Sequence, residues 1–149
     1  MTIPEMLRRV KSLNMPLAVQ ESLKSTAFEA IKLNQNQLRL KGQKSDGSFL
    51  KDYQSESYAE YKNFLNSSPG FGRPDFYDTG DFQDGFYVQV KTNALIFGSV
   101  DEKSDKLEAR DGKEIFGLTK ENKKVYAVQF VKPELFAYIT RVTGLKFRW

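Results

Sequence analysis

A change in the spacing of apolar residues after Phe82 restricts the fold more than any other feature of the sequence. From there, apolar and more polar side chains alternate in the order Phe86, Tyr87, Val88, Gln89, Val90 and Lys91. This two-residue period is typical of a strand with one buried face. Thr92 and Asn93 then form a turn, and the segment 94–99 returns as a second strand. The sequence therefore predicts a β-hairpin with Phe86, Val88 and Val90 facing the core.

Two helices are predicted near the N-terminus. The first covers residues 3–13, because Thr2 and Glu5 have the spacing of a capping box and apolar residues then recur every three or four positions. The second begins at Pro16 and reaches about residue 33. It has apolar residues on two faces, so it lies between two layers of one core or meets a partner.

The rest of the chain alternates short elements with loops. Residues 35–41 (QNQLRLK) are predicted as a short strand, and Ser55 can cap a short helix. Thr119 caps the last helix, in which Pro133 either causes a kink or restarts the helix at a first-turn position. Gly144 is a natural C-terminal cap for this helix.

These elements predict a single α+β domain over residues 1–149. A small antiparallel sheet with a central hairpin packs against long N-terminal and C-terminal helices. Residues 1–33 are a helical extension, residues 34–144 form the α+β core, and residues 145–149 are a tail.

The composition removes several classes of chemistry. The 149 residues include no Cys and no His, which excludes disulfides, thiolate metal sites, Cys nucleophiles and Ser-His-Asp triads. The net charge of +4 is far below that of a dedicated nucleic-acid binder. No segment approaches the roughly 20 apolar residues that span a bilayer, and we expect no secretion signal and no contact with a membrane. We expect neither an enzyme nor a bound cofactor or metal.

The tripeptide Asp78-Thr79-Gly80 suggests one enzymatic alternative. Aspartic proteases of the viral type carry it once per chain, and a homodimer brings two Asp side chains together to share a proton. Here Asp81 follows directly, and an extra carboxylate disturbs such an arrangement. The preferred interpretation is a turn before the hairpin, with Gly80 at positive φ.

Two charge patterns have ordinary explanations as well. Asp75, Asp78, Asp81 and Asp84 recur every three residues, but they lack the ligand spacing of a calcium-binding loop and are interpreted as a solvated acidic rim. Basic residues near both ends of the chain leave a small DNA-binding module as a second alternative.

The order of motifs after Gly42 resembles a known family. GFGRPDFYDTGDF is followed by the hairpin, by IFGSVDEKSDKLE, and by DGKEIFGLTKEN at the start of the last helix. This order is similar to that of the virion-morphogenesis and tail-completion proteins of tailed bacteriophages, which form the neck between head and tail. The matching positions are Asp78, Thr79, Gly80, Gly98, Phe116, Gly117 and Leu118. Asp81 and Phe82 stand where this family often has a basic residue and Leu.

The resemblance implies a structural subunit without catalytic activity. Such proteins are head-tail connector or tail-completion components that form rings with copies of themselves. They contact portal-proximal head-completion proteins and tail proteins, and genomic DNA only passes through their channel. The expected location is the neck or tail of the virion, after assembly in the cytoplasm of the bacterial host.

A ring of identical subunits needs two different complementary surfaces on each subunit. Aromatic residues and Arg are enriched at the centres of interfaces, and a long loop or a chain end can reach a neighbour without disturbing the core. The candidate contact residues lie in the loop 68–77, on the second helix and in the tail. They are Phe71, Arg73, Phe76, Tyr77, Phe28, Ile31, Phe147, Arg148 and Trp149.

Overall fold

The computed structural model describes residues 1–146 and 148, and its fold is α+β, mostly helical, with one two-stranded antiparallel sheet. The elements are, in order, α1 (Ile3–Lys11), α2 (Met15–Ser25), α3 (Ala27–Lys41), α4 (Glu56–Leu65), α5 (Asp81–Asp84), β1 (Phe86–Val90), β2 (Leu95–Ser99), α6 (Ser104–Asp111), the 3-10 turn η1 (Lys113–Ile115), α7 (Lys120–Val125), the π-helical segment η2 (Tyr126–Val131) and α8 (Lys132–Thr143).

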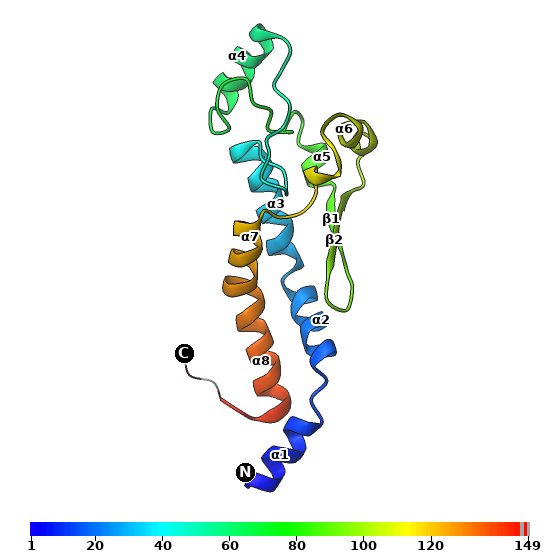
Figure 1. Cartoon of the computed structure of the whole chain (residues 1–149), viewed down its shortest axis with the longest axis vertical. Helices are drawn as coiled ribbons and strands as arrows, with labels where there is room; N and C mark the ends of the chain where they lie inside the picture. The colour runs from blue at the N-terminus through cyan, green and yellow to red at the C-terminus, as the bar shows by residue number, and fades with distance from the viewer. Residues whose placement is uncertain (147, 149) are drawn as a thin grey trace.

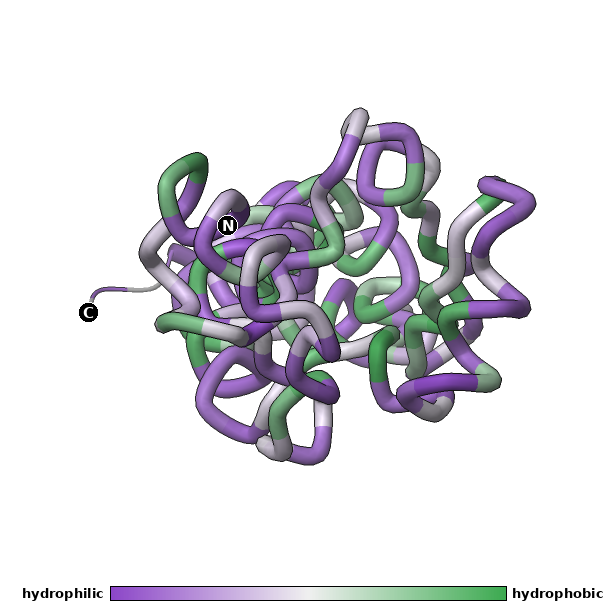
Figure 2. Tube along the Cα trace, turned by 90° about the horizontal axis from the view of Figure 1, so that it is seen from above, coloured by the Kyte–Doolittle hydropathy of each residue, from purple (hydrophilic) through white to green (hydrophobic). Residues whose placement is uncertain are grey.

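The molecule is elongated (Figure 1). The line of α2 and α3 runs antiparallel to the line of α7 and α8, the hairpin lies along one side, and α4 and α1 lie at opposite ends. The accessible surface is 9691 Å². A compact monomer of 17.1 kDa would expose about 7,800 Å². Figure 2, which looks down the long axis, shows apolar stretches (green) on the outside of the molecule as well as inside.

The predicted hairpin and its register are confirmed. Val88 pairs with Phe97 and Val90 with Leu95, and the Lys91 amide donates to the Ala94 carbonyl to close the turn. Along β1, burial alternates as expected: Phe86 is buried, whereas Tyr87 and Gln89 are exposed.

The predicted strand over 35–41 is wrong, because α3 continues through it. Gln, Leu, Arg and Lys are good helix formers, and their short alternation of apolar and polar residues resembles a strand by chance. Leu38 is fully buried on the same helical face as Asn34. The helix ends at Gly42, whose φ of +58 suits a C-terminal cap. A side chain there would collide with Arg73 and the Pro74 carbonyl.

The predicted second helix is interrupted at Thr26. Its hydroxyl lies 2.7 Å from the Ser22 carbonyl and 2.8 Å from the Tyr126 hydroxyl. Burial raises the pKa of Tyr126, although the hydrogen bond with Thr26 opposes this shift. At this break, a buried polar contact between Thr26 and Tyr126 therefore connects the helices α2 and α3 to the last helix.

The last helix is continuous from Lys120 to Thr143, with Thr119 as its cap and Gly144 as its end, as predicted. Pro133 lies in the first turn of α8, directly after the six-residue π-helical segment η2, which agrees with the predicted restart at a first-turn position. The wider π turn changes the phase of the helix. Within this segment, Val128 is 53% exposed, while Tyr126 is buried.

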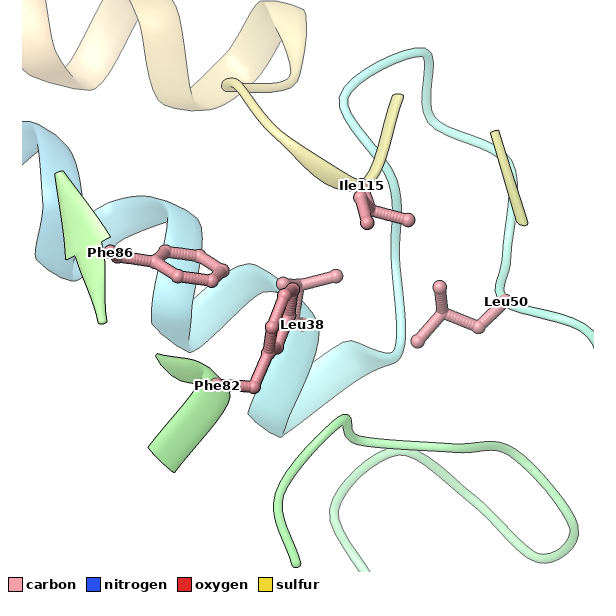
Figure 3. Packing of buried hydrophobic residues seen from close by; sticks show 5 residues of the cluster. All are labelled: Leu38, Leu50, Phe82, Phe86 and Ile115. Carbon is pink, nitrogen blue, oxygen red and sulfur yellow. The ribbon is translucent and has the colours of Figure 1, made fainter. Parts of the chain in front are cut away.

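The core consists of two adjoining clusters. Leu38, Leu50, Phe82, Phe86 and Ile115 form the first, with their side chains directed toward one another (Figure 3). Leu23, Ala30, Leu118 and Tyr126 form the second, which Val90, Leu95 and Phe97 of the hairpin cover in part. The segment that carries Ile115 and Leu118 therefore connects both clusters.

Two buried amides of α3 hold this connecting segment. The Asn34 side chain donates to the Ile115 carbonyl (3.2 Å) and accepts from the Gly117 amide (3.1 Å). The Gln37 side-chain oxygen accepts from the Thr119 amide (2.9 Å), and its nitrogen donates to the Gly117 carbonyl (3.2 Å). Both residues are at most 2% exposed. Because the segment has no strand partner, these side chains satisfy its backbone.

Replacing Gln37 with Ala should destabilise the protein strongly. The change leaves the buried Thr119 amide and the partly buried Gly117 carbonyl without these partners, at about 1–3 kcal/mol for each unsatisfied buried group. We expect the free energy of unfolding, measured by urea denaturation, to fall by at least about 2 kcal/mol. Asn36→Ala, an exposed position on the same helix, is the matched control and should change it by less than about 0.5 kcal/mol. Similar effects of both changes would contradict the role given to Gln37.

Candidate interaction surfaces

A buried ion pair attaches α4 to the rest of the molecule. The Lys62 ammonium lies 3.0 Å from a carboxylate oxygen of Asp75, and the two side chains are 9% and 6% exposed. Lys62 also donates to the Tyr77 carbonyl. Asp75 accepts from the Asn66 side chain (3.1 Å) and the Tyr77 amide (3.0 Å). These contacts fix which side of α4 faces inward.

The outer side of α4 is apolar and exposed, and Tyr58 at its border also contacts Tyr53. Ser55 caps the helix as predicted, and Ala59 and Lys62 are its buried residues. The outward side chains are Tyr58, Tyr61, Phe64 and Leu65, with exposed fractions of 42%, 57%, 86% and 58%. We call these four residues the aromatic face of α4. Such a cluster at one end of a molecule is typical of a protein-binding surface.

Most of the candidate contact residues in the loop 68–77 are engaged within the molecule. The Arg73 guanidinium stacks 3.7 Å from the centre of the Phe49 ring, and the Arg39 guanidinium covers Tyr77 at 4.0 Å. Phe76, at a φ of 52, meets Phe82 edge to face, 5.7 Å between ring centres. By contrast, Phe71 is 60% exposed. Among the candidate contact residues of this loop, Phe71 is therefore the one that a partner can reach.

The other candidates are divided between surface and interior. Phe28 is 64% exposed on α3, whereas Ile31 is half-buried against the first core cluster. In the tail, Arg148 is exposed. Phe147 and Trp149 lie outside the described residues.

α1 carries a second exposed apolar surface. Its predicted capping box is confirmed: the Thr2 amide donates to Glu5 (2.8 Å), and hydrogen bonds from the Thr2 amide and hydroxyl lower the pKa of Glu5. The cap is therefore complete at neutral pH and is lost as the pH falls through this lowered pKa. Ile3, Leu7 and Val10 are 73%, 54% and 42% exposed along one line of the helix. We call these three residues the apolar face of α1.

The Asp78-Thr79-Gly80 tripeptide forms a turn, as preferred from the sequence. Gly80 has a φ of +97 and precedes α5, a short helix that was not predicted before the hairpin. The Thr79 hydroxyl donates to the Asp81 carboxylate (2.8 Å), and Asp78 and Asp81 are both exposed. Among residues 1–146 and 148, no group of three or more acidic side chains could hold a metal ion.

A hollow of about 440 Å³ lies beside this turn. Lys62 and Asp75 line it, together with Tyr53 and Arg110. Burial and then the charge of Asp75 raise the pKa of Tyr53, so its hydroxyl stays protonated.

A larger, more apolar groove of about 590 Å³ separates β2 from α7 and η2. Leu95, Phe97, Leu118 and Tyr126 are among its lining residues. In the hairpin register, Leu95 and Phe97 direct their backbone N–H and C=O groups away from β1. This edge of the sheet is therefore open toward the groove.

No helix in the described part of the chain is both long enough and apolar enough to cross a membrane. Comparisons of the chain with protein-family models, with curated proteins and with solved structures gave no match.

Helical spacing alone places Tyr58, Tyr61 and Leu65 on one side of α4, but it gives no sign that this side is exposed. The missing signal is the inward position of Lys62, since a lysine in a helix is normally assigned to the solvent side. A single acidic partner in a loop 13 residues later reverses this assignment.

Breaking the ion pair should destabilise the protein more than removing an exposed lysine. Lys62→Met leaves the buried Asp75 carboxylate without its counter-charge, which costs about 3–5 kcal/mol in comparable sites. Lys51→Met, at an exposed position, is the control and should have little effect on urea unfolding. Adding Asp75→Asn to Lys62→Met should recover part of the loss. Equal unfolding midpoints for the two single variants would show that the pair does not stabilise the fold.

Proposed function

We propose that this protein is a structural subunit of the neck or tail of a tailed bacteriophage, a tail-completion or head-tail connector protein. It acts without catalysis, by assembling into a ring with copies of itself and by contacting head-completion and tail proteins. DNA passes through the ring without being recognised.

The observation that carries the assembly part of this proposal is the distribution of apolar surface. The molecule exposes about 1,900 Å² more than expected for its mass, and large apolar side chains are exposed at both of its ends. Typical monomers keep such clusters small, because exposed apolar surface is unfavourable in water. When neighbouring copies cover these apolar side chains in an assembly, the surface is likewise removed from water.

The bacteriophage part of the proposal depends on the motif order. Two glycines among the positions that match this family have a clear structural role in this fold. Gly98 lies under the Tyr87 ring, where a Cβ would come within 2.6 Å of the Tyr87 hydroxyl. Gly117, at a φ of +104, allows the connecting segment to turn between the Asn34 and Gln37 contacts. This fold requires both glycines, and the similar order of motifs supports the proposal that the chain has the architecture of that family.

Gene disruption in the encoding phage tests this function. Without the protein, we expect DNA-filled heads and unattached tails, seen by electron microscopy, and a loss of infectious particles of at least a hundredfold. Mass spectrometry of wild-type virions should detect the chain. Normal infectious particles that lack the protein would contradict the proposal.

Complementation with Asp78→Asn separates assembly from the protease alternative. Asp78 is exposed beside Asp81, so the change should preserve the fold and restore infectivity to the wild-type level. A fold-competent Asp78→Asn protein that blocks processing of other virion proteins would favour the protease instead.

A further inference from the structure

The two exposed apolar faces differ in charge and lie at opposite ends of the molecule. α4 and α1 mark the two ends of the long axis in Figure 1. The apolar face of α1 cannot reach the aromatic face of α4 within one molecule. Any contact between them joins two copies.

The apolar face of α1 is bordered by positive charge. Arg8, Arg9 and Lys11 are exposed, and the acidic residue of the helix, Glu5, is engaged in the capping box. Helical spacing places Lys11 one turn after Leu7, at the border of the apolar face. This end of the molecule therefore presents an apolar strip with basic side chains next to it.

The aromatic face of α4 is bordered by negative charge. Glu56 and Glu60 are exposed, whereas Lys62 is buried with Asp75 and contributes no positive charge to the surface. Helical spacing places Glu60 one turn before Phe64, at the border of the aromatic face. The ion pair that orients α4 thus also leaves its outer surface acidic.

We propose that the apolar face of α1 in one copy binds the aromatic face of α4 in the next copy. This rests on the proposed assembly function and names the contact within it. Ile3, Leu7 and Val10 cover the α4 aromatics, and Lys11 lies beside Glu56 and Glu60. The contact is head-to-tail, so each subunit uses one surface as donor and the other as acceptor. Such a contact closes into a ring when its rotation divides a full circle.

The size of the two faces sets the strength of the contact. An aromatic side chain buries about 150–250 Å² when fully covered, and the α4 face has three that are partly covered already. One contact therefore buries less than the roughly 800 Å² per partner of a standard interface. A single pair of copies associates weakly, and ring closure, which gives every subunit two contacts, stabilises the assembly.

Two charged substitutions test the contact on the full-length protein. Leu7→Asp alters the α1 face and Phe64→Asp alters the α4 face. Both side chains are more than half exposed, so circular dichroism and melting temperature should remain unchanged. We expect native mass spectrometry to show oligomers for the wild type and monomers for each variant, with association weakened at least tenfold. Val100→Asp, at an exposed apolar position directly after β2, is the matched control and should assemble normally.

Mixing the variants distinguishes a head-to-tail contact from a symmetric one. Leu7→Asp keeps an intact α4 face and Phe64→Asp keeps an intact α1 face, so an equimolar mixture should form dimers but no larger species. Lys11→Glu should weaken the wild-type assembly, and combining it with Glu60→Lys should restore it.

The outcomes separate this contact from the proposed function. Rings that persist in Leu7→Asp and Phe64→Asp would overturn the contact while leaving the role in the virion intact. A mixture that remains monomeric, or an effect confined to one face, would also overturn it. If the wild-type protein stays monomeric at all accessible concentrations, contact between copies is excluded. The gene disruption independently decides whether the protein acts in the virion.

Discussion

Hydrogen bonds between the side chains of Asn34 and Gln37 and the backbone of the segment 115–119 hold the two core clusters together. This segment belongs to no sheet or long helix, yet it contributes Ile115 to one core cluster and Leu118 to the other. Its backbone polar groups can be buried only because two side-chain amides form hydrogen bonds with them. The start of the last helix follows directly, so the same contacts fix where that helix begins along α3. The packing of the two helical lines is thus set by polar geometry at one end as well as by apolar contact along their length.

Local signals in the sequence were sufficient for much of this fold. The caps at Thr2, Ser55 and Thr119 and the hairpin register depend on neighbours within a few residues, and all are as predicted. The strand predicted over 35–41 was wrong, because α3 continues through this segment and buries the polar Gln37 next to Leu38. The hydrogen-bond partners of Gln37 in the connecting segment lie about 80 residues away, and no periodicity in the sequence indicates such pairing.

The exposure of the candidate contact residues also depends on contacts between distant parts of the chain, which the sequence pattern does not indicate. Aromatic residues in the loop 68–77 suggested a contact region, but Phe76 and Tyr77 are half-buried against Phe82 and Arg39. The pair between Asp75 and Lys62 holds the loop in this position. The same pairing turns the outer side of α4 toward solvent. Aromatic side chains make up 13% of the chain, and several of them are exposed. For those of α4, the non-local Lys62–Asp75 pair determines that they remain outside.

The π-helical segment before Pro133 has a consequence for the geometry of any assembly. An α-helix advances about 100° per residue, so gain or loss of one residue in a wide turn rotates everything beyond it by about that angle. Beyond η2 lie α8 and, packed against its end, α1. The segment therefore sets the rotation of α8 relative to α7, and Tyr126 anchors it to the second core cluster. A change of length after Tyr126 would turn the α8 surface against which α1 packs, and so the direction in which that end of the molecule points.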